Sequence, residues 1–174
     1  MPVTDKRSAL LDKLADHVLA EGLAASSLRA LAKAAGTSDR MLLYYFKDKS
    51  EIVGAILEVI AQRQMGLLAA EMTPDPLPLD ALRQRLWDSL SGEAMWPFMC
   101  VWLEVASLSA RGDVFYRTVG EVIGRGFLDW GKSQLDSPND AARDRDAARL
   151  LTSIEGMLVL KSFGLADISQ QALD

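Results

Sequence analysis

The sequence predicts an all-α protein, because helical periodicity recurs along most of its 174 residues and no segment alternates apolar and polar residues as a half-buried strand does. A proline-rich segment, TPDPLPLD at Thr73–Asp80, is the clearest interruption, and it is short enough to be a loop inside a helical bundle. The predicted architecture is an amino-terminal three-helix helix-turn-helix domain, residues 1–48, joined by a long helix to a helical bundle within residues 49–174.

The composition favours a globular cytoplasmic protein. Hydrophobic residues make up 49% of the chain and charged residues 25%, which provides enough apolar surface for a core. No uninterrupted apolar run approaches the roughly 20 residues that span a bilayer, and the charged, amphipathic start does not resemble a signal peptide. The single cysteine, Cys100, cannot form an internal disulfide, as expected in a reducing compartment. We therefore expect no membrane partner.

The first helix is predicted over about Asp5–Glu21, where Leu10, Leu14 and Val18 recur at a spacing of four residues and form one apolar stripe. Gly22 is expected to end it, because glycine commonly follows the last turn of a helix.

Ser27, Ser38 and Asp48 are predicted N-caps of the next three helices, because their side-chain oxygens can accept the free amide protons of a first turn. Asp48, followed three residues later by Glu51, resembles a capping box. This box is expected to open a long helix over about Lys49–Glu71.

Further helices are predicted over Leu79–Leu90, Trp96–Ala110, Asp113–Leu135 and Ala141–Gly164. Pro97 has no amide proton and fits a first-turn position, so that helix should begin near Trp96. A helix beginning at Glu93 would instead be kinked at Pro97. Ser137, followed by Pro138, predicts a cap-then-proline start for the last long helix.

The segment LRALAKAAGTSDRMLLYYF, Leu28–Phe46, has the spacing of a helix-turn-helix. Ala32 is small where two steeply crossing helices approach most closely, and Gly36 suits the left-handed conformation of a tight turn. The residues expected to face inward are Leu31, Ala35, Leu42 and Tyr45. Those expected to face outward are Ser38, Asp39, Arg40, Met41, Leu43 and Tyr44.

The distribution of charge favours a nucleic-acid partner for this segment, although the whole chain has a net charge of −5. From Leu28 to Lys49 there are five cations (Arg29, Lys33, Arg40, Lys47, Lys49) and two anions (Asp39, Asp48). Charges farther apart than about 10 Å are largely screened. A local basic patch on an acidic body is therefore sufficient to bind phosphates. We call Leu28–Lys49 the basic segment.

The run AKAAGTSDRMLLYYFKDKSEI resembles the amino-terminal signature of transcription regulators of the tetracycline-repressor (TetR) type. In that signature a glycine turn, a short third helix ending in an aromatic pair, and a lysine opening the fourth helix follow in order. The resemblance is strong over about Leu10–Leu57 and architectural beyond it. It implies a dimeric, DNA-binding regulator without enzymatic activity, most often a repressor that a small molecule releases.

Carried over residue by residue, the DNA contacts of such regulators fall at or near the starts of the second and fourth helices and along the third: Ser27, Arg29, Ser38, Asp39, Arg40, Met41, Leu43, Tyr44, Tyr45, Lys47 and Lys49. Many members have a phosphate-contacting tyrosine where this chain has Leu43, so Tyr44, Lys47 or Lys49 would have to anchor the DNA backbone. Arg40 stands where many members have glycine. Its guanidinium suits guanine O6 and N7, with a phosphate contact or a solvated arginine as the alternative.

Tyr45 and Phe46 are expected mainly to pack against the domain, although the Tyr45 hydroxyl could also meet a phosphate.

A band rich in aromatic and sulfur-containing side chains lies between Trp87 and Trp102. It predicts core or the wall of a ligand cavity, and these two interpretations overlap. Methionine adapts to irregular shapes, which favours an apolar or aromatic ligand. The predicted ligand contacts are Trp87, Met95, Phe98, Met99, Trp102 and Leu103. Glu104 is the candidate polar contact, with an exposed or intersubunit role as the alternative.

Asp113–Leu135 and Ala141–Gly164, the two longest helices after the loop, are predicted to form a homodimer interface. Small residues along them would allow two subunits to approach closely: Gly120, Gly124, Gly126 and Gly156. A two-fold interface of this kind would match a near-palindromic site in double-stranded operator DNA.

The sequence thus predicts a ligand-responsive DNA-binding regulator with an unidentified small-molecule effector. The alternatives are an effector-independent DNA-binding protein of the same fold, or an all-α carrier or enzyme. No catalytic residue is predicted, because no acid–base constellation surrounds His17, the only histidine. One histidine and one cysteine also disfavour a zinc site, so no metal or other cofactor is expected.

Overall fold

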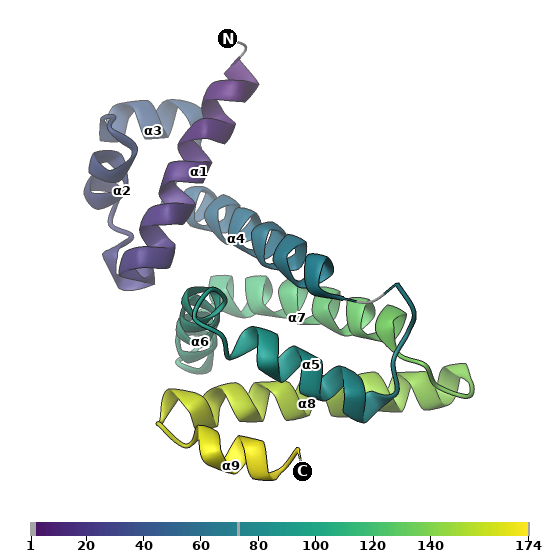
Figure 1. Ribbon diagram of the computed structural model, residues 1–174. Coiled ribbons are helices and arrows are strands. Elements are labelled where there is room, and N and C mark those ends of the chain that lie inside the picture. Colours follow the sequence, from purple (N-terminus) through teal and green to yellow (C-terminus); the bar gives the residue numbers. More distant parts are fainter. Residues whose placement is uncertain (1–2, 73, 174) are drawn as a thin grey trace. The chain divides into compact units, whose positions relative to one another are not determined.

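The computed structural model describes residues 3–72 and 74–173, with side chains from Lys6 onward (Figure 1). Over these residues the regular structure is helical apart from one isolated parallel bridge between Leu77 and Leu135. The predicted all-α class is therefore confirmed.

The elements follow one another as α1 Val3–Glu21, η1 Leu23–Ala25, α2 Leu28–Ala35, α3 Asp39–Tyr45, α4 Lys49–Glu71, α5 Leu79–Leu90, α6 Trp96–Ala110, α7 Val114–Gln134, α8 Asp140–Ser162 and α9 Ala166–Gln171. The predicted bounds of α4, α5 and α6 are confirmed, and those of α7 and α8 differ by one or two residues at each end. Pro97 is the second residue of α6, as its missing amide proton predicts.

Two features of the carboxy-terminal part were not predicted correctly. Asn139 caps α8, because its Oδ1 accepts a hydrogen bond from Ala142 N at 2.9 Å. The predicted cap, Ser137, lies too far from the first turn and instead donates its hydroxyl to Asp146 Oδ2 at 2.9 Å. The short helix α9 was missed, since six residues offer little periodicity to detect.

The chain divides into two compact units. The first comprises the chain up to Leu67 together with Cys100–Val119. In it α1 packs on α2, and α2 on α3. Its core side chains, each 2% exposed or less, include Leu14, Val18, Leu31, Leu42, Phe46, Ile52 and Ile56. Burying one such side chain stabilises the fold by about 1.5–3 kcal/mol.

The second unit comprises Leu68–Met99 and the chain from Gly120 onward, and in it α8 packs on both α5 and α9. Its core includes Leu82, Leu86, Leu90, Met95, Leu150, Ile154 and Leu158. The proline-rich loop is fastened to the end of α7, because Leu77 donates to the Gln134 carbonyl at 2.8 Å and accepts from Asp136 N at 2.9 Å. The loop is thus part of the bundle, as predicted.

Helix α4 is, among the described helices, the one long and apolar enough to cross a membrane by length and composition. Glu58 and Arg63 interrupt its apolar run, and core helices of globular proteins meet the same criterion.

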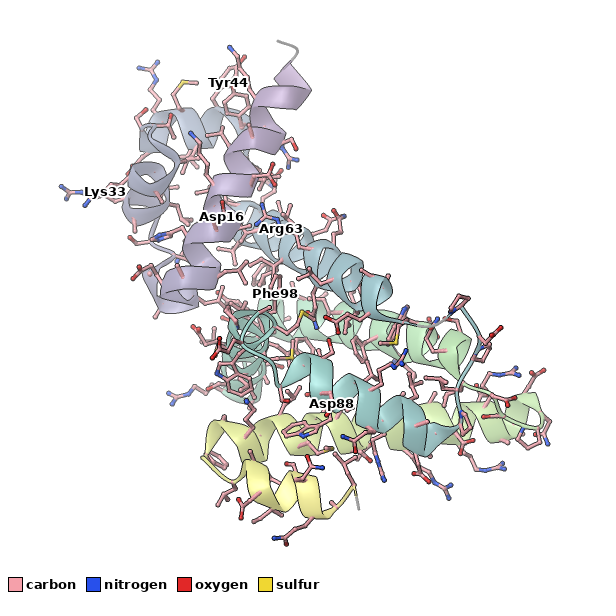
Figure 2. All side chains as sticks on the ribbon, viewed as in Figure 1. Asp16, Lys33, Tyr44, Arg63, Asp88 and Phe98 are labelled. Atoms are coloured by element: carbon pink, nitrogen blue, oxygen red, sulfur yellow. The ribbon has the colours of Figure 1, made fainter. Side chains whose placement is uncertain are left out.

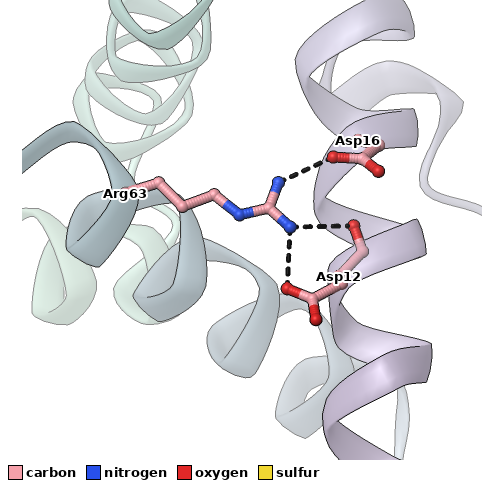
Figure 3. A network of polar contacts seen from close by, with 3 residues as sticks. All are labelled: Asp12, Asp16 and Arg63. Atoms are coloured by element: carbon pink, nitrogen blue, oxygen red, sulfur yellow. Dashed lines mark hydrogen bonds and ion pairs between the residues drawn. The ribbon is translucent and has the colours of Figure 1, made fainter. Parts of the chain in front are cut away.

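Arg63 of α4 also holds α1 in place within the first unit (Figure 3). Its Nη2 donates to Asp12 Oδ1 at 2.7 Å and to the Asp12 carbonyl at 3.3 Å, while Nη1 donates to Asp16 Oδ1 at 2.7 Å. The hydrogen bond that Arg63 donates to the Asp12 carboxylate is the main cause that raises the pKa of Arg63, so the guanidinium stays charged. The Arg63 side chain therefore binds two successive turns of α1.

Candidate nucleic-acid interface

Serine side chains fix the starts of α2 and α3. Ser27 Oγ accepts a hydrogen bond from Ala30 N at 3.2 Å, and Ser38 Oγ accepts one from Met41 N at 3.3 Å. Both serines have extended backbone conformations, as N-cap residues require. The two predicted caps are confirmed, and they determine which residues fall on the first turn of each helix.

The turn between α2 and α3 depends on Gly36, whose φ of 68° and ψ of 37° lie in the left-handed region. Gly36 N donates to the Lys33 carbonyl at 3.1 Å and Thr37 N donates to the Ala32 carbonyl at 2.9 Å. These are the two bonds of a Schellman motif, which satisfies the last carbonyls of a helix. The predicted glycine turn is confirmed, and Ala32 is buried as expected.

The two faces of α3 separate as the sequence predicted. Ser38, Asp39, Arg40, Met41, Leu43 and Tyr44 are all exposed. On the opposite side Leu42 is fully buried, as are Leu31 and Ala35 of α2. Tyr45 was predicted to face inward, but it is only half-buried. We call α3 the reading helix.

Tyr44 is the most prominent side chain of the reading helix. It is 71% exposed and projects away from the domain (Figure 2). Its ring meets that of Tyr45 edge to face, with centroids 5.2 Å apart. Leu43 is 45% exposed but has no hydroxyl to donate to a phosphate. The exposed Tyr44 next to it in sequence does carry one.

Phe46 ends the reading helix and packs into the core at 2% exposure, which confirms its predicted packing role. The Arg7 guanidinium of α1 lies 4.5 Å from the centre of its ring. Arg7 Nη2 also lies 3.5 Å from Glu51 Oε1 of α4. The amino-terminal part of α1 is thereby attached to the end of the reading helix and the start of α4.

The start of α4 departs slightly from the predicted capping box. Asp48 Oδ1 accepts from Glu51 N at 2.9 Å, which confirms Asp48 as the N-cap. Glu51 Oε2, however, accepts from Lys47 N at 2.7 Å rather than from the cap residue itself. The return bond is displaced by one residue, and it still fixes the backbone from which the Lys47 and Lys49 side chains extend.

The cations of the basic segment are exposed on the described surface. The basic residues Arg29, Lys33, Arg40, Lys47 and Lys49, together with Ser27, are exposed. Lys33 was counted among the cations but left out of the predicted contacts, and it projects outward from α2 (Figure 2). Its spacing of four residues from Arg29 already indicated that the two share a helix face.

Residues 11–56 match the family described as "Bacterial regulatory proteins, tetR family". The match spans the second half of α1, both helices of the helix-turn-helix and the first part of α4. The chain carries the amino-terminal domain of the TetR family. The predicted resemblance is thus confirmed over these residues, which form the helix-turn-helix domain of a transcriptional regulator of this type.

Solved structures extend the likeness in fold to almost the whole chain. A protein described as a TetR-family transcriptional regulator from Rhodococcus sp. has a TM-score of 0.73 at 18% identity, covering 98% of this chain and 95% of its own. A transcriptional regulator from Rhodococcus sp. Rha1 has a TM-score of 0.72 at 18% identity, covering 95% and 90%. At such identities the likeness establishes the fold.

A third structure, the transcriptional regulator FadR from Bacillus subtilis in complex with stearoyl-CoA, has a TM-score of 0.57 at 17% identity, covering 96% of this chain and 95% of its own. A search of curated protein sequences found no match.

The apolar band between Trp87 and Trp102 is mostly interior. In the second unit Trp87, Met95, Phe98 and Met99 are each at most 8% exposed. In the first unit Trp102 and Leu103 are half-buried. The second unit also holds a groove of about 740 Å³ lined by Glu71, Ala81, Gln84, Arg85, Asp88, Ser89, Gly92, Glu93, Ala94 and Met95. Of the predicted ligand contacts, Met95 is the one that lines this groove.

Glu104 makes an intramolecular contact within the first unit. Its Oε2 accepts a hydrogen bond from Leu23 N, at the turn after α1, at 2.8 Å. Burial raises the pKa of the Cys100 thiol one helical turn away, and the negative charge of Glu104 contributes to that shift. Within the described residues no group of three or more His, Cys, Asp and Glu side chains is arranged to hold a metal ion.

Proposed function

We propose that this chain is a cytoplasmic, ligand-responsive repressor that binds a near-palindromic operator as a homodimer and has no enzymatic activity. A small apolar or aromatic effector releases it from DNA. The proposed domains are residues 1–48 for DNA binding and residues 49–174 for effector binding and dimerisation.

The observation that carries the proposal is the exposed face of the reading helix. A helix that packs on the domain through one face and exposes the other suits entry into the major groove, which admits an α-helix. Arg40, Met41 and Tyr44 lie on this face. The exposed cations beside it supply the sequence-independent attraction to phosphates.

The predicted contacts divide into two roles. Arg40 is proposed to read a guanine, since arginine spans O6 and N7 with two hydrogen bonds. Lys47 and Lys49 are proposed to bind phosphates, because their flexible ammonium groups carry charge without base selectivity. Ser27 and Arg29 take the same role at the start of α2.

The proposed homodimer uses α7 and α8. The outer face of α8 carries Gly156 and Val159, and Phe163 is the C-cap residue of this helix. Their spacings of three and four residues place the three on one side. Phe163 is 73% exposed and Val159 39%. A Cβ atom placed on Gly156 would have no atom within 4 Å apart from the neighbouring backbone of its own helix. We call these three residues the outer stripe. An isologous pairing there would place two reading helices about 34–36 Å apart.

The proposed effector site is the apolar band: Trp87, Met95, Phe98, Met99, Trp102 and Leu103. Its support is the burial of four of these side chains and the presence of an acyl-CoA in the FadR structure, whose fold is similar. Helix α4 is continuous from Lys49, next to the reading helix, to Glu71. A shift of α4 on effector binding would change the spacing of the two reading helices. The effector must then bind the released state more tightly.

The proposal is tested by selecting duplexes from a random double-stranded DNA library with the purified full chain. The expected outcome is an enriched near-palindrome with half-site centres separated by about 10–10.5 base pairs or a multiple of that spacing. We refer to its best member as the selected duplex. No enrichment by a folded, helical protein would favour the carrier or enzyme alternative.

The effector is sought by thermal-shift screening with aromatic and fatty-acyl compounds. A stabilising compound is then titrated calorimetrically against the free protein and against its complex with the selected duplex. Coupling is reciprocal, so a releasing effector must bind the complex more weakly than the free protein. Equal affinities would reject release through α4, and Trp87→Ala or Trp102→Ala with unchanged compound affinity would reject the proposed site. Absence of any stabilising compound would favour the effector-independent alternative.

A further inference from the structure

The turn between α1 and α2 lacks a cap from its own sequence. Gly22 ends α1, and the one-turn helix η1 begins directly after it at Leu23. Gly22 occupies the N-cap position but has no side chain to accept the free amide proton of that first turn.

Glu104 of α6, 81 residues later in the chain, supplies the missing acceptor. Its Oε2 accepts a hydrogen bond from Leu23 N at 2.8 Å, and this bond is partly buried within the first unit. A hydrogen bond to a charged acceptor is shorter and stronger than one between neutral groups. Helix α6 therefore caps the turn that joins α1 to α2.

Gly22 and Glu104 fit each other closely. A Cβ atom placed on Gly22 would lie 2.6 Å from Glu104 Oε1 and 3.3 Å from its Cδ. The φ of Gly22, 79°, is also one that other residues rarely adopt. Glycine is thus required here both for the backbone conformation and for the approach of the carboxylate.

The capped turn determines where the DNA-facing part of α2 begins. Leu23, the first residue of η1, and Ser26, which directly follows η1, are buried at 6% and 1% exposure. Ser27 follows at once as the N-cap of α2, whose outward face carries Arg29. A displacement of η1 would therefore move the start of α2 together with its cation.

We infer that Glu104 is a positioning residue for DNA binding: its carboxylate fixes the turn between α1 and α2, and through it the start of α2 and the exposed residues around it. The inference rests on the proposed function. It also gives α6, whose Trp102 and Leu103 directly precede Glu104, a direct bond to the DNA-binding domain that does not pass through α4.

The test compares Glu104→Ala with Glu104→Gln in the full chain. Alanine removes the acceptor, whereas the glutamine amide oxygen can still accept from Leu23 N. We expect Glu104→Ala to bind the selected duplex about tenfold more weakly and to exchange the Leu23 amide proton about tenfold faster. Glu104→Gln should restore both values to within about threefold of the parent, because an uncharged acceptor keeps part of the bond.

The matched control is Glu58→Ala, which removes an exposed carboxylate from α4 of the same unit. It should change neither measurement. Amide exchange in α5 and α8 should be unaffected in all three variants, which distinguishes a local change at the turn from general destabilisation.

A double-mutant cycle tests the close fit. Gly22→Ala in the parent adds both backbone strain and a clash with Glu104, whereas in the Glu104→Ala background only the strain remains. Gly22→Ala should therefore weaken DNA binding by a smaller factor in that background. Equal factors in both backgrounds would contradict the direct contact.

An unchanged Leu23 exchange rate in Glu104→Ala would overturn the inference, as would faster exchange with unchanged affinity for the selected duplex. If the parent chain binds no duplex, the proposed function fails, and the DNA-positioning role of Glu104 fails with it. A different outcome is that the parent binds the selected duplex and Glu104→Ala matches the Glu58→Ala control in both affinity and Leu23 exchange. In that case the proposed function stands and this inference alone is rejected.

Discussion

Two exposed surfaces of the molecule differ in their chemistry. The face of the reading helix is polar and aromatic, with Arg40 and Tyr44 exposed and cations close by. The outer stripe at α8 is apolar: a Cβ atom on Gly156 would have open space, and Phe163 is 73% exposed. Neither set of side chains contributes to the core, so removal of either should leave the folded chain largely intact.

The difference indicates that the two surfaces are suited to different partners. Arginine and lysine next to a helix face attract a polyanion over several ångströms, and the attraction weakens with salt. An apolar stripe gains free energy only by excluding water, which a second apolar surface of matching shape can do. The reading helix is therefore proposed for DNA and the outer stripe for a second copy of the chain.

The largest expected effect comes from Gly156→Arg on the outer stripe. In a single chain the Cβ atom at this position has open space around it, and replacing a helical glycine should raise helix stability slightly. In the proposed dimer it would place a charge within an apolar contact. We expect a folded monomer by light scattering and an affinity for the selected duplex lower by more than about 100-fold, because the two half-sites are no longer bound together.

Gly66→Arg is the matched control, since Gly66 lies in α4 with equally open space. It should remain dimeric with unchanged DNA affinity. A Gly156→Arg chain that stays dimeric at micromolar concentration would show that the outer stripe is not the interface.

Helix starts and turns around the reading helix could be predicted because their causes are local. A serine cap acts on an amide three residues away, and Gly36 closes its turn within five residues, so both leave a readable pattern. The outward face of α3 then follows from helical periodicity. This is why the candidate contacts of the reading helix other than Tyr45 were correctly placed on the surface.

Contacts between distant segments left no such pattern. Glu104 was considered as a ligand contact, because nothing near it in sequence indicates a bond to Leu23. The ion pairs from Arg63 to Asp12 and Asp16 were likewise not predicted. On the outer stripe Gly156 was identified from its size, while Phe163 and Val159 were not, since periodicity alone does not separate an exposed apolar residue from a buried one.

A smaller effect is expected from Arg40→Ala on the reading helix. If the guanidinium reads a guanine, the variant should lose about 1–3 kcal/mol of discrimination at one base pair of the half-site and little elsewhere. The measurement is the affinity for a set of duplexes in which each position of the selected half-site is changed in turn. Arg111→Ala, which removes an exposed arginine outside the basic segment, should leave the whole profile unchanged. A uniform loss across the set would reassign Arg40 to a phosphate.

The smallest effect is expected from Lys49→Ala, which removes one proposed phosphate contact at the start of α4. Each neutralised phosphate releases condensed counterions, so the plot of log affinity against log salt should become shallower by about one unit. The loss at a fixed salt concentration should be similar for the selected duplex and for its single-position variants, because a phosphate carries no sequence information. Lys13→Ala, an exposed lysine of α1 outside the basic segment, serves as the control and should keep the parent slope. If Lys49→Ala instead changes the preference at one position while the salt slope stays the same, Lys49 contacts a base, and the division between base-reading and phosphate-binding residues proposed for this domain is wrong.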